Sequence, residues 1–164
     1  MSETYVECLI KKEASSVVKA CKLSLYIMVG MFAVGGLLFP LFLFIALLGG
    51  FLAYFINLNT DLEYEYLYLD KEITVDVIKA KAKRKRMARI SVDRLEILAP
   101  IRSHHLDSYK NRDIKAKDYS TGIAQQPDGR YVLIYDGTNK IIISPSEEFV
   151  KAIRNVAPRK VFMD

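Results

Sequence analysis

The chain has 164 residues, 51% of them hydrophobic, and carries 24 Lys and Arg against 19 Asp and Glu, a formal net charge of +5. This length leaves room for one domain of ordinary size beside a membrane segment and excludes a large multidomain protein. A net charge this small identifies no class of partner, so the distribution of charged and apolar residues is more informative than their totals.

Residues 1–22 mix apolar side chains with lysines, and the apolar positions recur at spacings compatible with one helical face. An interfacial helix is one interpretation, and we predict that residues 1–15 form a cytoplasmic lead-in. Cys8 and Cys21 are expected to be unpaired, reduced thiols, because neither has a second Cys or a His at metal-ligand spacing.

The run from Leu23 to Ile56 contains no Asp, Glu, Lys, Arg or His. One straight helix of that length would be roughly 50 Å long, whereas the hydrocarbon core of a bilayer is about 30 Å thick. Two glycines and Pro40 interrupt the run near its middle, and a proline suits the first turn of a new helix. We therefore predict a transmembrane helical hairpin over residues 16–57.

Basic residues flank both ends of the predicted hairpin, and the loop between its helices is uncharged. By the positive-inside rule, both termini are expected in the cytoplasm, in a multi-pass protein of the cell membrane. The apolar run is too long for a cleaved secretory signal. Apart from Lys19 and Lys22 at the entry of the first helix, the spans contain no Asp, Glu, Lys, Arg or His, which argues against a proton relay or a transporter site.

Alternating side chains replace the continuous apolar run after Asn57, and this change predicts β structure. Residues 62–68 and 73–77 form two predicted strands, joined by a two-residue turn at Asp70-Lys71. This register places an aromatic residue opposite each β-branched partner. The predicted pairs are Tyr68 with Ile73, Tyr66 with Val75, and Tyr64 with Val77.

The same register sets Glu65 opposite Asp76, a like-charge pair that needs a cation from a third strand. Residues 79–89, with the sequence KAKAKRKRMAR, contain seven basic residues. We expect this segment to form a third antiparallel strand and to lay its lysines beside the acidic face of the first hairpin.

The C-terminal part is predicted to contain a second hairpin and one helix. Residues 131–135 and 140–143 are apolar strands around a turn. Ser144 and Glu147 have the spacing of a capping box, which predicts an amphipathic helix over residues 145–156.

These elements predict a membrane α+β protein, in which a transmembrane helical hairpin is followed by a small antiparallel β domain over residues 58–164, closed by the C-terminal helix. The arrangement resembles the pleckstrin-homology-like (PH-like) domains of bacterial membrane-attached proteins. Residues 101–126 are mostly polar, and we predict a loop there with one strand within residues 114–119. Such a long connection is uncommon unless it has a function.

Short motifs occur along nearly the whole chain: CLIKK at 8–12, EYEY at 63–66, KRKR at 83–86, EILAP at 96–100, SHHLDSY at 103–109, DYSTG at 118–122 and APRKVF at 157–162. Together they resemble an uncharacterised family of short two-span membrane proteins of Gram-positive bacteria. The sequence departs from the family pattern at Asp70-Lys71, where a glycine turn is usual. The resemblance implies a cytoplasmic PH-like β domain of unknown function and supplies no catalytic residues.

The basic run is the strongest functional signal, because the cytoplasmic leaflet attracts each nearby Lys or Arg by about 1 kcal/mol. The residues expected to dock on anionic lipid headgroups are Lys81, Lys83, Arg84, Lys85, Arg86 and Arg89. Alternatively, these residues only fix topology and pair with acids inside the sheet. Nucleic acid is a lesser alternative, since the nearby tyrosines belong to the predicted buried face and not to a stacking surface.

His104 and His105 are the only histidines. They could ligate a metal with Asp107 or Asp113, but no further His and no Cys stands at the spacing of a zinc site, so no metal or other cofactor is expected. The sequence contains no nucleophile elbow and no phosphate loop. We therefore assign no catalytic residue and do not expect an enzyme.

The expected function is that of a non-enzymatic, membrane-anchored scaffold or binding module. It would present the β domain to anionic lipid headgroups or to a protein partner, including a membrane protein or a second copy of the chain. The polar loop from Arg102 to Gly122 is a second candidate contact. The alternative is a small accessory subunit of a larger membrane complex, with its spans packed against other helices.

Overall fold

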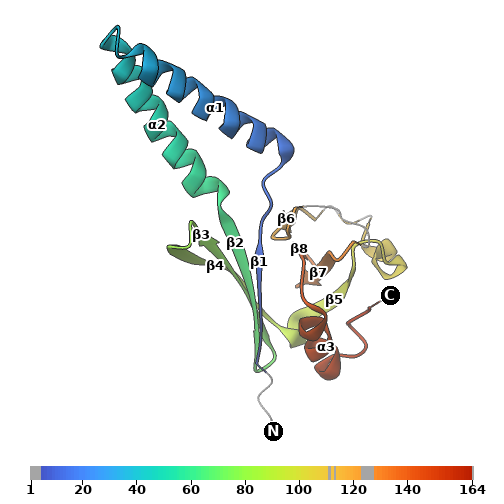
Figure 1. Cartoon of the computed structure of the whole chain (residues 1–164). Helices are drawn as coiled ribbons and strands as arrows, with labels where there is room; N and C mark the ends of the chain where they lie inside the picture. Colours follow the sequence, from blue (N-terminus) through green and yellow to red (C-terminus); the bar gives the residue numbers. More distant parts are fainter. Residues whose placement is uncertain (1–4, 111, 113, 123–127, 164) are drawn as a thin grey trace.

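The computed structural model describes residues 5–110, 112, 114–122 and 128–163. Its strands are β1 (Val6–Lys11), β2 (Leu62–Leu69), β3 (Glu72–Lys79), β4 (Lys83–Ser91), β5 (Leu95–Pro100), β6 (Ala116–Asp118), β7 (Tyr131–Tyr135) and β8 (Asn139–Ile143). Its helices are α1 (Ser16–Gly35), α2 (Leu41–Thr60) and α3 (Glu147–Val156), with short 3-10 helices at Val92–Arg94 and His104–Tyr109. Figure 1 shows α1 and α2 projecting together from the β domain.

The β domain consists of two four-stranded sheets. The first has the strand order β1-β2-β3-β4 and is antiparallel throughout. The second has the order β5-β7-β8-β6, in which β6 runs parallel to β8. Side chains from both sheets and from α3 form the main hydrophobic core. The prediction of a small, largely antiparallel β domain closed by a C-terminal helix is confirmed.

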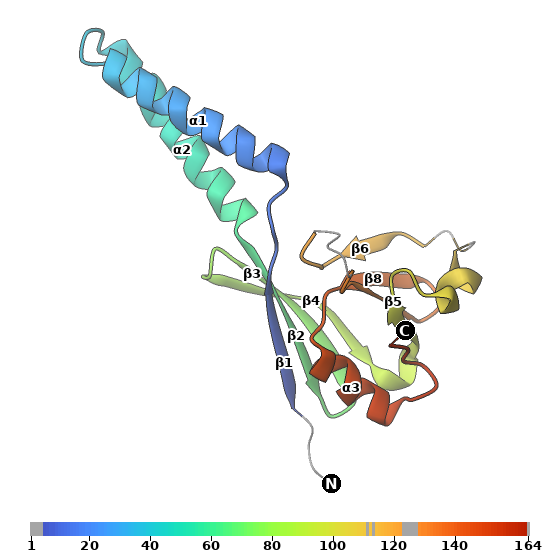
Figure 2. The same cartoon turned by 45° about the vertical axis from the view of Figure 1, so that its right-hand side comes forward.

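Helices α1 and α2 form an antiparallel pair outside the β domain, and both are long and apolar enough to cross a membrane. Within the most apolar 18 residues of each helix, the buried share is 0% in α1 and 6% in α2. A core helix of a soluble protein would be mostly buried. A Cβ added to Gly49 would lie 2.8 Å from Cγ2 of Val29, so a glycine permits this close approach. The helices lie close at their connecting loop and diverge toward the β domain (Figures 1 and 2).

The lead-in is a strand and not an interfacial helix, so that interpretation is wrong over β1. Alternate residues of β1 (Val6, Cys8 and Ile10) pack against the core, while Glu7 and Leu9 are exposed, and this period of two is that of a strand. β1 pairs with β2 along its whole length, and the backbone N–H of Lys12 extends the ladder by donating to the carbonyl of Leu62 over 2.9 Å. The helical hairpin is therefore an insertion between two neighbouring strands.

The register predicted for β2 and β3 is confirmed at all three tyrosine pairs. The connecting turn places Asp70 at φ 49° and Lys71 at φ 63°. Positive φ at both central positions is typical of a type I′ turn, which matches the right-handed twist of the strands it joins. Asp tolerates this conformation better than most residues, so the turn forms without a glycine.

Tyr66 joins the two sheets from the centre of the core. Its side chain is fully buried, and its hydroxyl donates to the carbonyl of Tyr119 over 2.5 Å and accepts a hydrogen bond from the N–H of Ser144 over 3.2 Å. Burial raises the pKa of this phenol far above its ordinary value, so it stays protonated. Helix α3 is capped by Ser146, whose Oγ accepts from the N–H of Phe149, and the capping box predicted at Ser144 is wrong.

Because β1 and β2 are neighbours, replacing residues 15–59 by a short Gly-Ser linker should give a soluble domain that keeps both sheets. We expect a monomeric elution volume, a β-type circular dichroism spectrum and cooperative thermal unfolding. The control is a fragment of residues 58–164, which lacks β1 and exposes the edge of β2. This fragment should aggregate, and equal folding of the two proteins would contradict the structural role of β1.

Candidate functional site

Strand β4, which carries most of the basic run, contains a β-bulge. The register shifts between Val75 and Asp76 of β3, so Met87 has no partner there. An extra residue changes which side chains share a face of the sheet. As a result, three arginines from both sides of the bulge face the same outer surface: Arg84, Arg86 and Arg89.

Arg84 neutralises two buried acids on this outer surface. Its Nε lies 2.7 Å from Oδ2 of Asp76, and its Nη2 pairs with Glu65. Asp76 is 3% exposed and Glu65 is 7% exposed, and they stand opposite each other in β3 and β2, as predicted. Nε of Arg86 approaches Asp76 to 3.6 Å. The expectation of a compensating cation is confirmed, but the expectation that lysines supply it is wrong.

The acids share their surroundings with one more carboxylate, Glu7 of β1. Burial raises the pKa of Glu65, and the hydrogen bond with Glu7 adds to this effect against the opposing charge of Arg84. The hydrogen bond to Asp76 raises the pKa of Arg84. Arg84 is therefore held against the outer face of the sheet by these carboxylates, and its charge is largely balanced by them although its side chain is exposed.

Arg89 also forms an ion pair, in which its Nη2 lies 2.5 Å from Oε2 of Glu72. The remaining residues of the predicted docking set, Lys81, Lys83 and Lys85, are exposed and form no ion pair with any residue that the structure describes. Ordinary alternation along the strand accounts for the position of Lys83 and Lys85, which lie on the other side of β4 from Arg84 and Arg86. The bulge adds Arg89 to the side of these arginines.

The turn between β3 and β4 lies at the base of the helical hairpin. The N–H of Ala80 donates to the carbonyl of Asp61, directly after α2, over 2.8 Å. Ala80 and Lys81 adopt φ values of 48° and 56°, as positive as those of Asp70 and Lys71, but this loop has three residues because Lys79 pairs with Lys83. Lys81 is thus on the side of the β domain from which the helices project (Figure 1).

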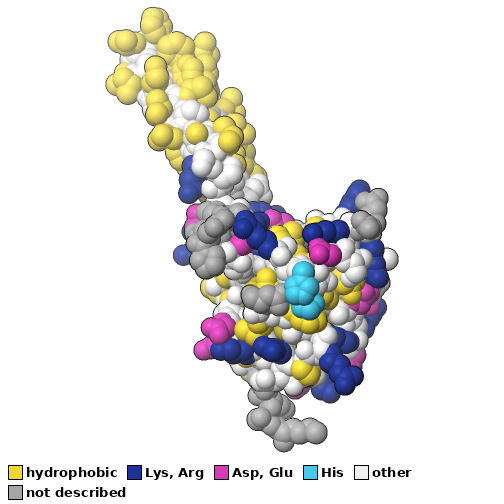
Figure 3. All heavy atoms as spheres, turned by 90° about the vertical axis from the view of Figure 1, so that its right-hand side faces the viewer, with side chains coloured by type: hydrophobic (Ala, Val, Ile, Leu, Met, Phe, Trp, Pro, Cys, Tyr) yellow, Lys and Arg dark blue, Asp and Glu magenta, His cyan; other side chains and the backbone are white. Residues whose placement is uncertain are grey.

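A second basic group, which the sequence analysis did not bring together, surrounds the base of the hairpin. A cavity of about 640 Å³ opens there, and four lysines line it: Lys11, Lys12, Lys19 and Lys22. They come from β1, from the segment after it and from α1. Figure 3 shows hydrophobic side chains covering the hairpin and Lys and Arg side chains beginning at its base. The only sequence signal for this group is that each lysine flanks a span.

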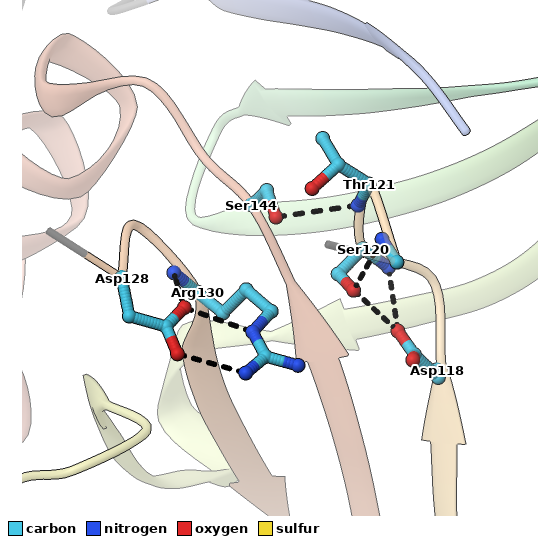
Figure 4. Close-up of polar contacts among 7 residues, drawn as sticks. Asp118, Ser120, Thr121, Asp128, Arg130 and Ser144 are labelled. Atoms are coloured by element: carbon cyan, nitrogen blue, oxygen red, sulfur yellow. Dashed lines mark hydrogen bonds and ion pairs between the residues drawn. The ribbon is translucent and has the colours of Figure 1, made fainter. Parts of the chain in front are cut away.

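The polar connection over residues 101–122 is held by local hydrogen bonds. Oδ1 of Asp118 accepts from the N–H and the hydroxyl of Ser120, over 2.9 Å and 2.6 Å (Figure 4). The N–H of Thr121 donates to Oγ of Ser144, which joins this segment to the end of β8. The strand predicted within this connection is confirmed as β6.

His105 stacks on Phe162, with ring centroids 3.7 Å apart. Asp113, the predicted companion of the histidines in a metal site, lies outside the described residues. Among the residues that are described, no group of three or more His, Cys, Asp or Glu is placed to hold a metal ion. Cys8 and Cys21 are free thiols, the first half-buried and the second exposed.

The sequence matches the family described as bacterial PH-like domain (DUF6106) over residues 2–163. The chain belongs to this family. The predicted family resemblance and the predicted fold class are therefore confirmed. No curated protein and no solved structure matches the chain significantly.

Membership of the bacterial PH-like domain family indicates a binding module, because domains of this fold are in general non-catalytic. The two exposed apolar helices indicate association with a membrane. Together these features describe a PH-like domain that carries an exposed, apolar helical hairpin.

Replacing Arg84 by Ala leaves Asp76 and Glu65 buried, with only Arg86 as a nearby cation. Since a hydrogen bond to a charged group contributes about 1.5–3 kcal/mol, we expect the free energy of unfolding to fall by about that amount. Lys85→Ala is the matched control, because this neighbour is exposed and its loss should change stability by less than about 0.5 kcal/mol. Chemical unfolding of the full chain in mild detergent measures both. Equal stability of the two variants would contradict the assigned role of Arg84.

Proposed function

We propose that this protein is a non-enzymatic, membrane-anchored binding module with both termini in the cytoplasm. The hairpin spans the cell membrane, and the β3–β4 turn docks the β domain on anionic lipid headgroups. The observation that carries the proposal is the hydrogen bond from the N–H of Ala80 to the carbonyl of Asp61, because it keeps the turn beside the end of a span. The exposed lysines of the docking set, Lys81, Lys83 and Lys85, follow directly.

Docking by these lysines is weak for a free protein but sufficient for an anchored one. Each lysine at a cytoplasmic surface contributes about 1 kcal/mol of attraction to anionic lipid, and three give about 3 kcal/mol. The hairpin already holds the domain at the bilayer, so docking is intramolecular and requires no recruitment from solution. The lysines therefore set the orientation of the β domain against the membrane. The arginines of β4 instead form ion pairs with acids of the sheet.

The topology can be tested at Leu37, which is 84% exposed in the loop between α1 and α2. In a chain with Cys8 and Cys21 replaced by Ser, a Leu37→Cys variant should react with an impermeant maleimide on intact protoplasts. The control is Val156→Cys in α3, an exposed position that should react only after permeabilisation. The reverse pattern would place the termini outside the cytoplasm and refute the proposal.

The docking contact can be tested by replacing Lys81 with Gln in the full chain. In nanodiscs, amide exchange in residues 79–83 should be slower with phosphatidylglycerol in the bilayer than with phosphatidylcholine alone. Lys81→Gln should reduce this difference, because it removes a charge from the turn that faces the headgroups.

Lys71→Gln is the matched control for this experiment. Lys71, like Lys81, is the second residue of positive φ in its turn, with φ 63° against 56° for Lys81, but it lies at the other end of β3, roughly 25 Å away at about 3.3 Å per residue. Its loss should leave the lipid-dependent protection unchanged. Protection that does not depend on phosphatidylglycerol, or that both variants reduce equally, would refute docking through the β3–β4 turn.

A further inference from the structure

The cavity at the base of the hairpin is built by segments that are distant in the sequence. Helices α1 and α2 diverge toward the β domain (Figure 1). The cavity is lined by residues of both helices, of the end of β1 and the segment after it, and by Ala80 of the β3–β4 turn. Its volume of about 640 Å³ lies within the range of about 300–1,000 Å³ that is usual for small-molecule sites. The cavity is therefore large enough for a lipid headgroup.

Positive charge predominates in this cavity. Four lysines line it against two acidic residues, Glu13 and Asp61. Nζ of Lys11 lies 2.9 Å from Oδ1 of Asp61, and this hydrogen bond is the main reason why the pKa of Asp61 is lowered, with further contributions from the charges of Lys81 and Lys22. One lysine thus neutralises Asp61, and the remaining lysines exceed the acids.

Two of the remaining lysines have no counter-ion. Lys19 and Lys22 lie one helical turn apart on α1, both line the cavity, and neither forms an ion pair with any residue in the described part of the chain. Lys22 is half-buried. Lysines near the end of a membrane span extend toward the headgroup region. Two that line one cavity can contact a single phosphate.

The position of the cavity along the two candidate spans indicates that the phosphate comes from a lipid headgroup. Lys19 and Lys22 belong to the first two turns of α1, while Tyr54 and Leu58 line the cavity from the last turns of α2. These are the ends of the two candidate spans, where headgroups meet the hydrocarbon core. The exposed apolar surface of the helices continues from this point and suits acyl chains.

We propose that this cavity binds the headgroup phosphate of one anionic phospholipid, held by Lys19 and Lys22 and by the hydroxyl of Tyr54. The inference rests on the proposed membrane anchoring and deepens it, but the residues that would hold the phosphate belong to α1 and α2 and are not the lysines of the docking set. A zwitterionic lipid carries its own cation beside the phosphate and would compete poorly for the lysines. The site thus selects phosphatidylglycerol-type headgroups over phosphatidylcholine.

The test is calorimetric titration of the purified full chain, in a neutral detergent, with short-chain phosphatidylglycerol and with short-chain phosphatidylcholine. The unmodified chain should bind phosphatidylglycerol more tightly. A Lys19→Gln and Lys22→Gln double variant should bind it about 30-fold more weakly, the effect expected from losing two lysine contacts. A double variant with Arg at both positions keeps the charge and should restore binding, which controls for altered insertion or folding.

Lys71→Gln should bind phosphatidylglycerol as the unmodified chain does, because Lys71 lies at the other end of β3 and does not line the cavity. The titration is made in detergent, so it does not depend on docking of the β domain on a bilayer. If the titration fails, the amide-exchange result for docking is unaffected. Equal affinity of the unmodified chain for both lipids would overturn the proposed site. So would unchanged binding by the Gln double variant.

Discussion

The pairing of β1 with β2 is the constraint on which the rest of the structure depends. Their ladder runs from Val6 opposite Tyr68 to Lys11 opposite Glu63, and the whole helical hairpin lies between these two strands. Both ends of the hairpin must therefore return to one place on the same side of any membrane they cross. The connections between the strands and the helices are short, because the N–H of Lys12 already donates a hydrogen bond to the carbonyl of Leu62. The helices therefore have little freedom to tilt relative to the β domain. A flexible tether would not impose this geometry.

The features that follow from local periodicity could be predicted from the sequence. The uncharged run forms two helices, and the alternation around Tyr64 to Tyr68 sets the register with β3. The missed features depend on contacts between distant segments. β1 finds its partner only after the hairpin, and Ser146 caps α3 while Ser144 bonds Tyr66 and Thr121. The bulge at Met87 has no local signature, yet it places Arg89 on the side of the sheet that carries Glu72.

The basic run therefore contains two groups with different surroundings, arginines paired with acids and exposed lysines. Its arginines are suited to buried or crowded acids, because a guanidinium offers several donors in a fixed plane and stays charged. Its lysines are hydrated point charges on flexible stems, which suits contact with a mobile lipid surface. The division follows residue type as well as geometry, since the four ion pairs that β4 forms with described residues of β2 and β3 all use Arg. A count of positive charges would treat the two groups as one.

Insertion of the hairpin between β1 and β2 has a consequence for biogenesis. β1 leaves the ribosome before either span, whereas β2 follows both, so at about 5–20 residues per second β1 waits roughly 3 to 12 s for its partner. During that time the strand edge is open, and the first sheet cannot close until α1 and α2 have been synthesised. A chain whose hairpin is misplaced across the bilayer would leave β1 and β2 on opposite sides. Completion of the β domain thus serves as a check that both spans have been inserted in the same sense.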